Sequence, residues 1–244
     1  VDVVAIVGRL CAVVVEVAGD GLKTVLLLSV VALLTSLLMC FLSRAASDDE
    51  LHARIRDGAY LYVDGVIDGL VLGFIDEEMT SSGTKTLLRN LAGVIKTVSH
   101  GLIRQAFSSA SRAEMHKLVA YLRDRIQVVP IHEQATGAIV FPHARDNVAE
   151  FRTCFAASRE GRATSMRPEY TEAMLRFIDD GLHYYFELPF SMLELGFVTR
   201  RAVSLGRSTI HAGSHAAIKR SIATDTEDEL RHLTDWLDAR FVGG

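Results

Sequence analysis

The sequence predicts an all-α protein with an N-terminal transmembrane helix and a multi-helix body that contains at most one short β-hairpin. Residues 24–43, TVLLLSVVALLTSLLMCFLS, carry no charge. Twenty helical residues span about 30 Å, the thickness of the hydrocarbon core of a bilayer. Capping boxes, in which a serine or threonine is followed three residues later by glutamate, open three of the predicted helices, at Ser47, Ser111 and Thr226.

A shorter hydrophobic stretch precedes the uncharged run and is interrupted by charge. Its sequence, VDVVAIVGRLCAVVVEVAGDG, contains Arg9 and Glu16, which lie on one face of a helix because they are two turns apart. Each charge would cost about 3 kcal/mol at the centre of a bilayer, so both are expected to meet partners. We interpret residues 1–46 as a membrane-embedded helical hairpin or anchor whose first arm packs against other subunits.

Positive charge is more frequent after the uncharged run than before it. Lys23 precedes the run, and three arginines follow it: Arg44, Arg54 and Arg56. Positively charged flanks stay on the cytoplasmic side of a membrane. The sequence therefore predicts an integral membrane protein whose C-terminal body lies on the cytoplasmic or matrix side.

A long helix is predicted from Ser47 to about Met79, and its second half contains regularly spaced glycines. Gly65, Gly69 and Gly73 recur every four residues and leave a flat stripe along which another helix can approach closely. Because each glycine costs a helix about 1 kcal/mol relative to alanine, three in register indicate compensation by packing. Together with Arg9 and Glu16, these glycines are the predicted helix-packing interface.

Asp64 and Asp68 lie beside the glycine stripe, four residues apart and surrounded by apolar residues. They could form a proton-handling or metal-binding pair, in which one carboxyl raises the pKa of the other. The alternative is a solvated or arginine-paired seam, because structural ion pairs also perturb carboxylates.

Residues 84–111 predict a basic amphipathic helix. Its expected apolar face consists of residues at helical spacing: Leu87, Leu91, Val94, Ile95, Val98, Leu102 and Ile103. No acid occurs between Met79 and Glu114, whereas four of the helix's residues are cationic: Lys85, Arg89, Lys96 and Arg104. Such a helix binds an anionic leaflet or an acidic partner. Packing on a core with a solvated basic face is the alternative.

The remaining sequence predicts one short extended region and several helices. A helix from Ser111 to about Gln127 is followed by QVVPIHEQATGAIVF, a hairpin or loop. Further helices are expected at residues 147–160, 168–187, 189–205, 208–222 and 226–241. The predicted divisions are the anchor at 1–46, the long helices at 47–127, the loop or hairpin at 128–145 and a C-terminal helical domain at 146–244.

A second basic block lies between Leu195 and Thr224, where acids are again absent. Its cations are Arg200, Arg201, Arg207, Lys219 and Arg220. The net charge of −4 gives no global attraction to nucleic acid, and no aromatic residue suited to base stacking follows Phe197 in this block. The predicted partners are other subunits of a membrane complex and anionic lipid, with no specific nucleic acid.

Metal ligation by histidines and carboxylates is the main chemical alternative. Glu229 and His232 match the Glu-x-x-His motif of di-metal helical bundles, and Asp180 and His183 resemble it with aspartate substituted. The resemblance to ferritin-like di-iron proteins is confined to these two motifs. His211 and His215, four residues apart, could also share a metal if their segment is helical, but the sequence identifies no third ligand.

No cofactor is predicted apart from this di-metal alternative. Phosphate-binding loops, dinucleotide fingerprints, nucleophile elbows and Cys-x-x-Cys are missing from the sequence. The odd number of cysteines, Cys11, Cys40 and Cys154, does not support a disulfide framework. We therefore expect a non-catalytic accessory or structural subunit of a multisubunit membrane complex. The alternatives are a membrane-bound, metal-dependent helical enzyme and a peripheral lipid-binding or transport accessory protein.

Overall fold

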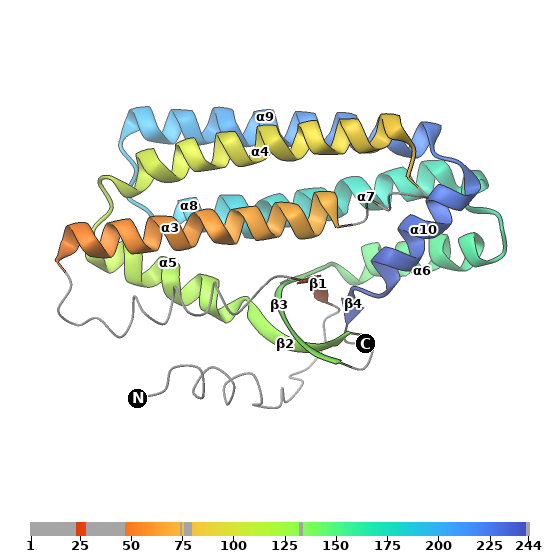
Figure 1. The fold of residues 1–244 in the computed structure, drawn as a ribbon, viewed down its shortest axis with the longest axis horizontal. Helices are drawn as coiled ribbons and strands as arrows, with labels where there is room; N and C mark the ends of the chain where they lie inside the picture. The colour runs from red at the N-terminus through yellow and green to blue at the C-terminus, as the bar shows by residue number, and fades with distance from the viewer. Residues whose placement is uncertain (1–22, 28–46, 74, 76–79, 132–133, 243–244) are drawn as a thin grey trace.

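The computed structural model describes residues 23–27, 47–73, 75, 80–131 and 134–242. Helices dominate it, which confirms the predicted all-α character (Figure 1). α4 (Ser82–Phe107) and α9 (Phe197–Thr224) run side by side in one layer. α3 (Asp48–Ile67) and α7 (Arg167–Leu182) lie in the layer beneath, in contact with α4 and α9 respectively.

Shorter elements complete the body below and beside these layers. α5 (Arg112–Asp124) contacts α3, and α6 (Arg145–Arg159) contacts α7 and α10 (Glu227–Asp238). A 3-10 turn, η2 (Ala163–Met166), joins α6 to α7, and the short α8 (Leu188–Ser191) precedes α9. Gly161, with φ of 72°, occupies the left-handed region where α6 ends.

The predicted capping residues begin three helices as expected. The side-chain oxygens of Ser47, Ser111 and Thr226 each accept from the backbone N–H three residues later, at 3.3 Å. At Ser111 and Thr226 the glutamate also accepts from the cap's own N–H, which completes the capping box. These side chains satisfy backbone donors that the first helical turn leaves without intrahelical partners.

A four-stranded antiparallel sheet, in the order β2-β3-β1-β4, corrects the prediction of at most one hairpin. The predicted hairpin is present as β2 (Ile126–Ile131) and β3 (Gln134–Pro142). β1 (Lys23–Leu27) pairs with β3 from Lys23↔Pro142 to Leu27↔Ala138, and β4 (Phe241–Val242) pairs with β1. These added strands come from distant parts of the chain, so no local pattern indicates their pairing.

β1 also bears on the predicted transmembrane segment. Thr24–Leu27 is extended instead of helical, whereas residues 28–43 lie outside the described residues, as do Arg9 and Glu16. None of the helices in the described residues is both long enough and apolar enough to cross a bilayer. The membrane anchor over residues 24–43 therefore stays a prediction.

Several helix boundaries differ from the sequence-based expectation. The predicted helix at 189–205 is interrupted, because α8 ends at Ser191 and α9 begins at Phe197. α3 continues into a π-helical segment, η1 (Asp68–Leu72), and the helix ends there instead of near Met79. The Gly73 carbonyl accepts from the indole Nε1 of Trp236 at 2.6 Å, so it is used in a tertiary contact. The expected break between residues 205 and 208 is also wrong, because α9 is continuous through it.

Gly206 lies where the break was expected and is closely approached by α4. A Cβ at this position would lie 2.6 Å from Cδ1 of Leu102 and 3.1 Å from Cγ1 of Val98, so the glycine allows α4 to approach closely. One heptad later, a Cβ at Gly213 would lie 3.4 Å from Cδ1 of Leu91. The small residues that serve close helix packing here are therefore on α9.

The apolar face of α4 is rotated relative to the prediction. Ile95, Leu102 and Ile103 are buried as expected, whereas Val94 is 48% exposed. Other buried positions include Leu88, Ala92, Ser99, Ala106 and Phe107. Because α4 packs between α3 and α9, it buries two faces instead of one stripe.

Buried side chains form two clusters. The first core joins α3, α4 and α5 to the end of α7, to α8 and to Ile210 of α9. The second core joins α6, α7 and α10 to Phe141 of β3 and to the C-terminal half of α9. The first core thus combines residues from both of the predicted units 47–127 and 146–244.

Candidate functional site

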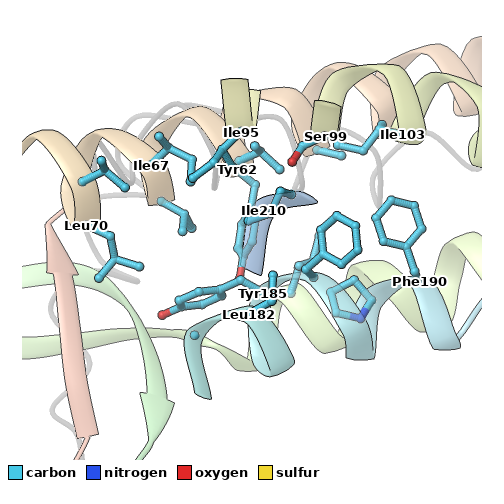
Figure 2. A pocket seen from close by; sticks show the side chains of 18 of the residues that line it. Tyr62, Ile67, Leu70, Ile95, Ser99, Ile103, Leu182, Tyr185, Phe190 and Ile210 are labelled. Carbon is cyan, nitrogen blue, oxygen red and sulfur yellow. The ribbon is translucent and has the colours of Figure 1, made fainter. Parts of the chain in front are cut away.

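An elongated apolar cavity lies within the first core. Its volume is about 120 Å³, and α3 and α4 line one side while the α7–α8 segment lines the other (Figure 2). Lining residues run from Ala59 to Val71 along α3 and η1, and from Ile95 to Phe107 along α4. At 1.5 Å per helical residue, each of these stretches extends about 18 Å. The cavity is therefore long relative to its volume.

Two π-helical segments contribute to the cavity wall. η1 supplies Leu70 and Val71, and η3 (His183–Glu187), which continues α7, supplies Tyr185 and Phe186. A π-helical turn inserts an extra residue and re-aims the side chains that follow, and such turns are frequent at functional sites. Both α3 and α7 therefore change to π-helical geometry beside the same cavity.

Tyr62 places a polar group in this apolar environment. Its side chain is 2% exposed, it lines the cavity, and its ring meets that of Tyr185 edge-on at 6.1 Å (Figure 2). Its hydroxyl is buried and has no hydrogen-bond partner in the described part of the chain. A buried hydroxyl without a partner costs about 1–3 kcal/mol, so it is a group that a ligand oxygen would satisfy.

Burial also determines the protonation state of the cavity's phenols. It raises the pKa of Tyr62 and of Tyr185 well above the ordinary value of 10.0, although the nearby charge of Arg125 acts in the opposite direction. Both hydroxyls are therefore neutral at physiological pH and are able to donate a hydrogen bond.

Asp64 and Asp68 face basic side chains of α4. Lys96 Nζ donates to Oδ1 of Asp68 at 2.7 Å, and His100 Nε2 lies 3.0 Å from Oδ1 of Asp64. Lys96 is also 4.0 Å from Asp64. The geometry favours the paired-seam interpretation, with lysine and histidine in place of the expected arginine.

Three of the four residues of the predicted di-metal site contact separate partners. Asp180 Oδ2 lies 2.7 Å from Nδ1 of the buried His143, and His183 pairs with Glu187. Glu229 accepts from the backbone N–H groups of Thr226 and Ser81, at 2.7 and 2.8 Å, so it serves the starts of α10 and α4. His232 is on α10, one turn after Glu229.

His211 and His215 do lie on one face of a helix, and α7 supplies a third group. Both Nε2 atoms lie close to Oδ1 of Asp179, at 3.2 Å for His211 and 2.8 Å for His215. Asp179 was missed in the sequence because only the packing of α7 on α9 brings it to these histidines. Tyr62 was missed because a tyrosine in an apolar helix gives no sign that its hydroxyl lacks a partner.

The predicted glycine stripe lies at the end of α3. Gly65 and Gly69 are half-buried, and Gly73 is exposed. A Cβ at Gly73 would lie 2.5 Å from the carbonyl oxygen of Gly69, so the constraint there comes from the chain's own turn. The role of these glycines in contacts with another subunit stays a prediction.

The two predicted basic blocks lie on neighbouring helices. Lys85, Arg89, Lys96 and Arg104 belong to α4, and Arg200, Arg201, Arg207, Lys219 and Arg220 belong to α9. Lys96 is paired with carboxylates of α3 and η1, and Arg207 Nε donates to Glu187 at 2.6 Å. Arg104, Arg201 and Arg220 are exposed.

Comparison of the chain with protein-family models, with curated protein sequences and with solved structures gives no significant match.

Proposed function

We propose that the helical body binds a lipid with a single linear acyl chain, as a peripheral lipid-binding or transport accessory protein does. The observation that carries this proposal is the apolar cavity with the unpartnered hydroxyl of Tyr62. Ligand sites are concave and mostly apolar, with a few polar groups that fix orientation. The cavity has that composition.

The shape and chemistry of the cavity support this ligand class. A small volume distributed along about 18 Å of helix suits an extended chain better than a fused ring system. Tyr62 stays protonated because burial raises its pKa, so it is a donor and calls for an acceptor oxygen on the ligand. A fatty acyl chain with a carbonyl or carboxyl oxygen meets both requirements.

Competition binding tests this proposal on the purified full-length chain. A fluorescent fatty acid is expected to bind with one site per chain and to be displaced by an unlabelled fatty acid. Ala59→Phe, which fills the cavity, should abolish binding. Tyr62→Phe should weaken it about 2- to 10-fold, which corresponds to the loss of one hydrogen bond of about 0.5–1.5 kcal/mol.

Tyr170→Phe is the matched control, because Tyr170 is equally buried but belongs to the second core. It should leave the affinity for the fatty acid unchanged. If the folded Ala59→Phe variant bound the fatty acid as well as the unmodified chain does, the ligand would lie elsewhere and the proposal would be overturned. A lack of any binding by the unmodified chain would also overturn it.

A second candidate function, that of an accessory subunit in a membrane complex, is favoured by an exposed apolar patch on α9. Phe197 is 76% exposed, Val198 72% and Leu205 69%. Arg200 and Arg201 lie within the same stretch. Exposed apolar side chains with adjacent cations and no acids fit an acidic partner subunit.

Co-purification tests this second function. Replacement of Phe197, Val198 and Leu205 by serine should release a partner that co-purifies with the unmodified chain from gently solubilised membranes. Leu61→Ser, at a 47% exposed position of α3, should retain it. If the patch variant instead loses binding to anionic liposomes while a partner stays bound, the patch contacts lipid and the subunit interpretation fails.

A further inference from the structure

Asp179, His211 and His215 form a compact group at the contact of α7 with α9. The two imidazole rings are 3.9 Å apart between centroids, with an interplanar angle of 33°. One potential ligand atom from each residue lies within 4.8 Å of the other two. The side chains of His211 and His215 are 34% and 19% exposed, and that of Asp179 is 45% exposed, so the group is accessible from solvent.

The donor set is one that divalent zinc prefers. Zn²⁺ binds imidazole nitrogen and carboxylate oxygen at about 2.0–2.2 Å, and sites with two histidines and one carboxylate keep a fourth position for water. Two histidines at i and i+4 on a helix present their nitrogens on one face, as they do in zinc-binding helices. α9 supplies this pair, and α7 supplies the carboxylate.

Two of the three separations between donor atoms are close to those that a zinc ion requires. Around a tetrahedral centre with bonds of about 2.05 Å, neighbouring ligand atoms are about 3.3 Å apart. Oδ1 of Asp179 lies 3.2 Å from Nε2 of His211 and 2.8 Å from Nε2 of His215. Side-chain rotation that widens the shorter separation by about half an ångström would bring it to the tetrahedral value.

Two imidazoles converge on one carboxylate oxygen at this place. Elsewhere one histidine approaches one carboxylate, as His183 Nδ1 does Glu187 at 3.0 Å. His211 and His215 instead share Oδ1 of Asp179, and a divalent ion binds such nitrogens as neutral ligands.

A surface groove lies next to the group. Thr171 and Glu172 of α7 and Ala223 of α9 line it together with Asp179 and His215. Because the groove is open to solvent, water or another small ligand has access to the side of the three residues that protein does not cover.

We propose that Asp179, His211 and His215 bind one Zn²⁺ ion, with a fourth coordination position directed toward the groove between α7 and α9. This site is separate from the apolar cavity. It also differs from the set Asp180, His183, Glu229 and His232 that the sequence indicated. The ion joins two helices that already pack on each other and that are linked at one end by Arg167 of α7, whose guanidinium donates to the Ile222 carbonyl of α9.

Titration of the metal-free full-length chain with Zn²⁺ tests the proposal. Competition with a colorimetric zinc indicator should give one ion per chain, and Co²⁺ substitution should give the visible absorption of tetrahedral coordination. His211→Ala, His215→Ala and Asp179→Asn should each weaken Zn²⁺ binding at least about tenfold, since even changes beyond the ligands cost 10- to 100-fold.

His183→Ala is the matched control, because it removes an exposed histidine that pairs with a single carboxylate. It should leave both stoichiometry and affinity for Zn²⁺ unchanged. Circular dichroism of each variant checks that α9 remains folded. Equal Zn²⁺ affinity in His211→Ala, His215→Ala and His183→Ala, or no binding by the unmodified chain, would overturn the proposal, whatever the outcome of the fatty-acid experiment.

Discussion

The two cores of this protein are built from similar residues but are filled differently. In the second core, the ring of Phe151 lies 5.2–6.3 Å from those of Phe155, Tyr170, Phe177 and Phe241. The first core instead contains a partly open cavity of about 120 Å³. The difference extends to polar atoms, because the hydroxyl of Tyr170 meets Thr234 Oγ1 at 2.9 Å, whereas that of Tyr62 has no partner among the described residues.

This difference concerns packing and hydrogen bonding. Protein interiors are normally close-packed, and buried polar groups are normally hydrogen-bonded. The second core contains a cluster of closely spaced rings, and its Tyr170 hydroxyl is hydrogen-bonded, although Ser158 Oγ and Asn147 Nδ2 on α6 have no partner among the described residues. The first core departs from close packing at its cavity and leaves the Tyr62 hydroxyl without a partner there.

The largest expected effect comes from removing one ring in each core. Phe151→Ala should lower the free energy of unfolding by about 3–5 kcal/mol, because it empties a filled aromatic cluster. Phe186→Ala, at a residue that lines the cavity, should cost at least about 1 kcal/mol less, since a side chain beside a void has fewer contacts to lose. Urea denaturation measures both values, and equal losses would contradict the contrast between the cores.

Removal of one tyrosine hydroxyl from each core should change the stability less, but in opposite directions or by clearly different amounts. Tyr170→Phe should destabilise the protein by about 1–2 kcal/mol, because it breaks a buried hydrogen bond and leaves Thr234 unpaired. Tyr62→Phe should be neutral or stabilising in the ligand-free protein, because it removes a buried group without a partner. Thermal unfolding of both variants, stripped of lipid, decides this. If Tyr62→Phe lowered the stability as much as Tyr170→Phe does, the Tyr62 hydroxyl would have a hydrogen-bond partner.

The smallest expected effect tests a feature that the two cores share. Glu114 accepts from the backbone N–H of Glu194 beside the first core, and Glu227 accepts from that of Thr164, at 2.8 Å, beside the second. These bonds to backbone N–H groups lower the pKa of both glutamates from the ordinary value of 4.5. A carboxyl with a lowered folded-state pKa contributes stability above its unfolded pKa and loses it as pH falls through the folded value.

Stability should therefore fall as the pH is lowered below about 4.5. Glu114→Gln and Glu227→Gln should each make that decline shallower, with the exposed Glu169→Gln as control. Denaturation midpoints between neutral and acidic pH measure this. If stability declined with falling pH as steeply in both variants as in the unmodified protein, other groups would control the acid response.

Signals within a few residues allowed the start of several helices to be predicted. Three helices are capped by side chains that accept from N–H groups three residues later, those of Ser47, Ser111 and Thr226. Such helix starts can be predicted without knowledge of the fold. The hairpin of β2 and β3 was predicted on similar grounds, because its two strands and their turn are consecutive. These features depend on local geometry.

Features that depend on tertiary packing were not predicted. The sequence predicted a break between residues 205 and 208, but α9 is continuous there, and Leu102 and Val98 of α4 lie close to its Gly206. β1 finds its partners in β3 and β4, which no nearby residue indicates. The grouping of Asp179 with His211 and His215 was not predicted either, because Asp179 lies on a different helix, α7. The cavity could not be predicted from the sequence either, because it lies between side chains of several helices that leave the space between them partly unfilled.

The continuity of α9 has a thermodynamic consequence. This single helix carries Ile210 at the cavity, His211 and His215 at the proposed metal site, and Ile218 and Ile222 in the second core. An occupant of the cavity that shifted α9 would also move both histidines relative to Asp179. Linkage between two binding sites is reciprocal. Whatever factor a bound lipid imposed on the affinity for zinc, zinc would impose the same factor on the affinity for the lipid.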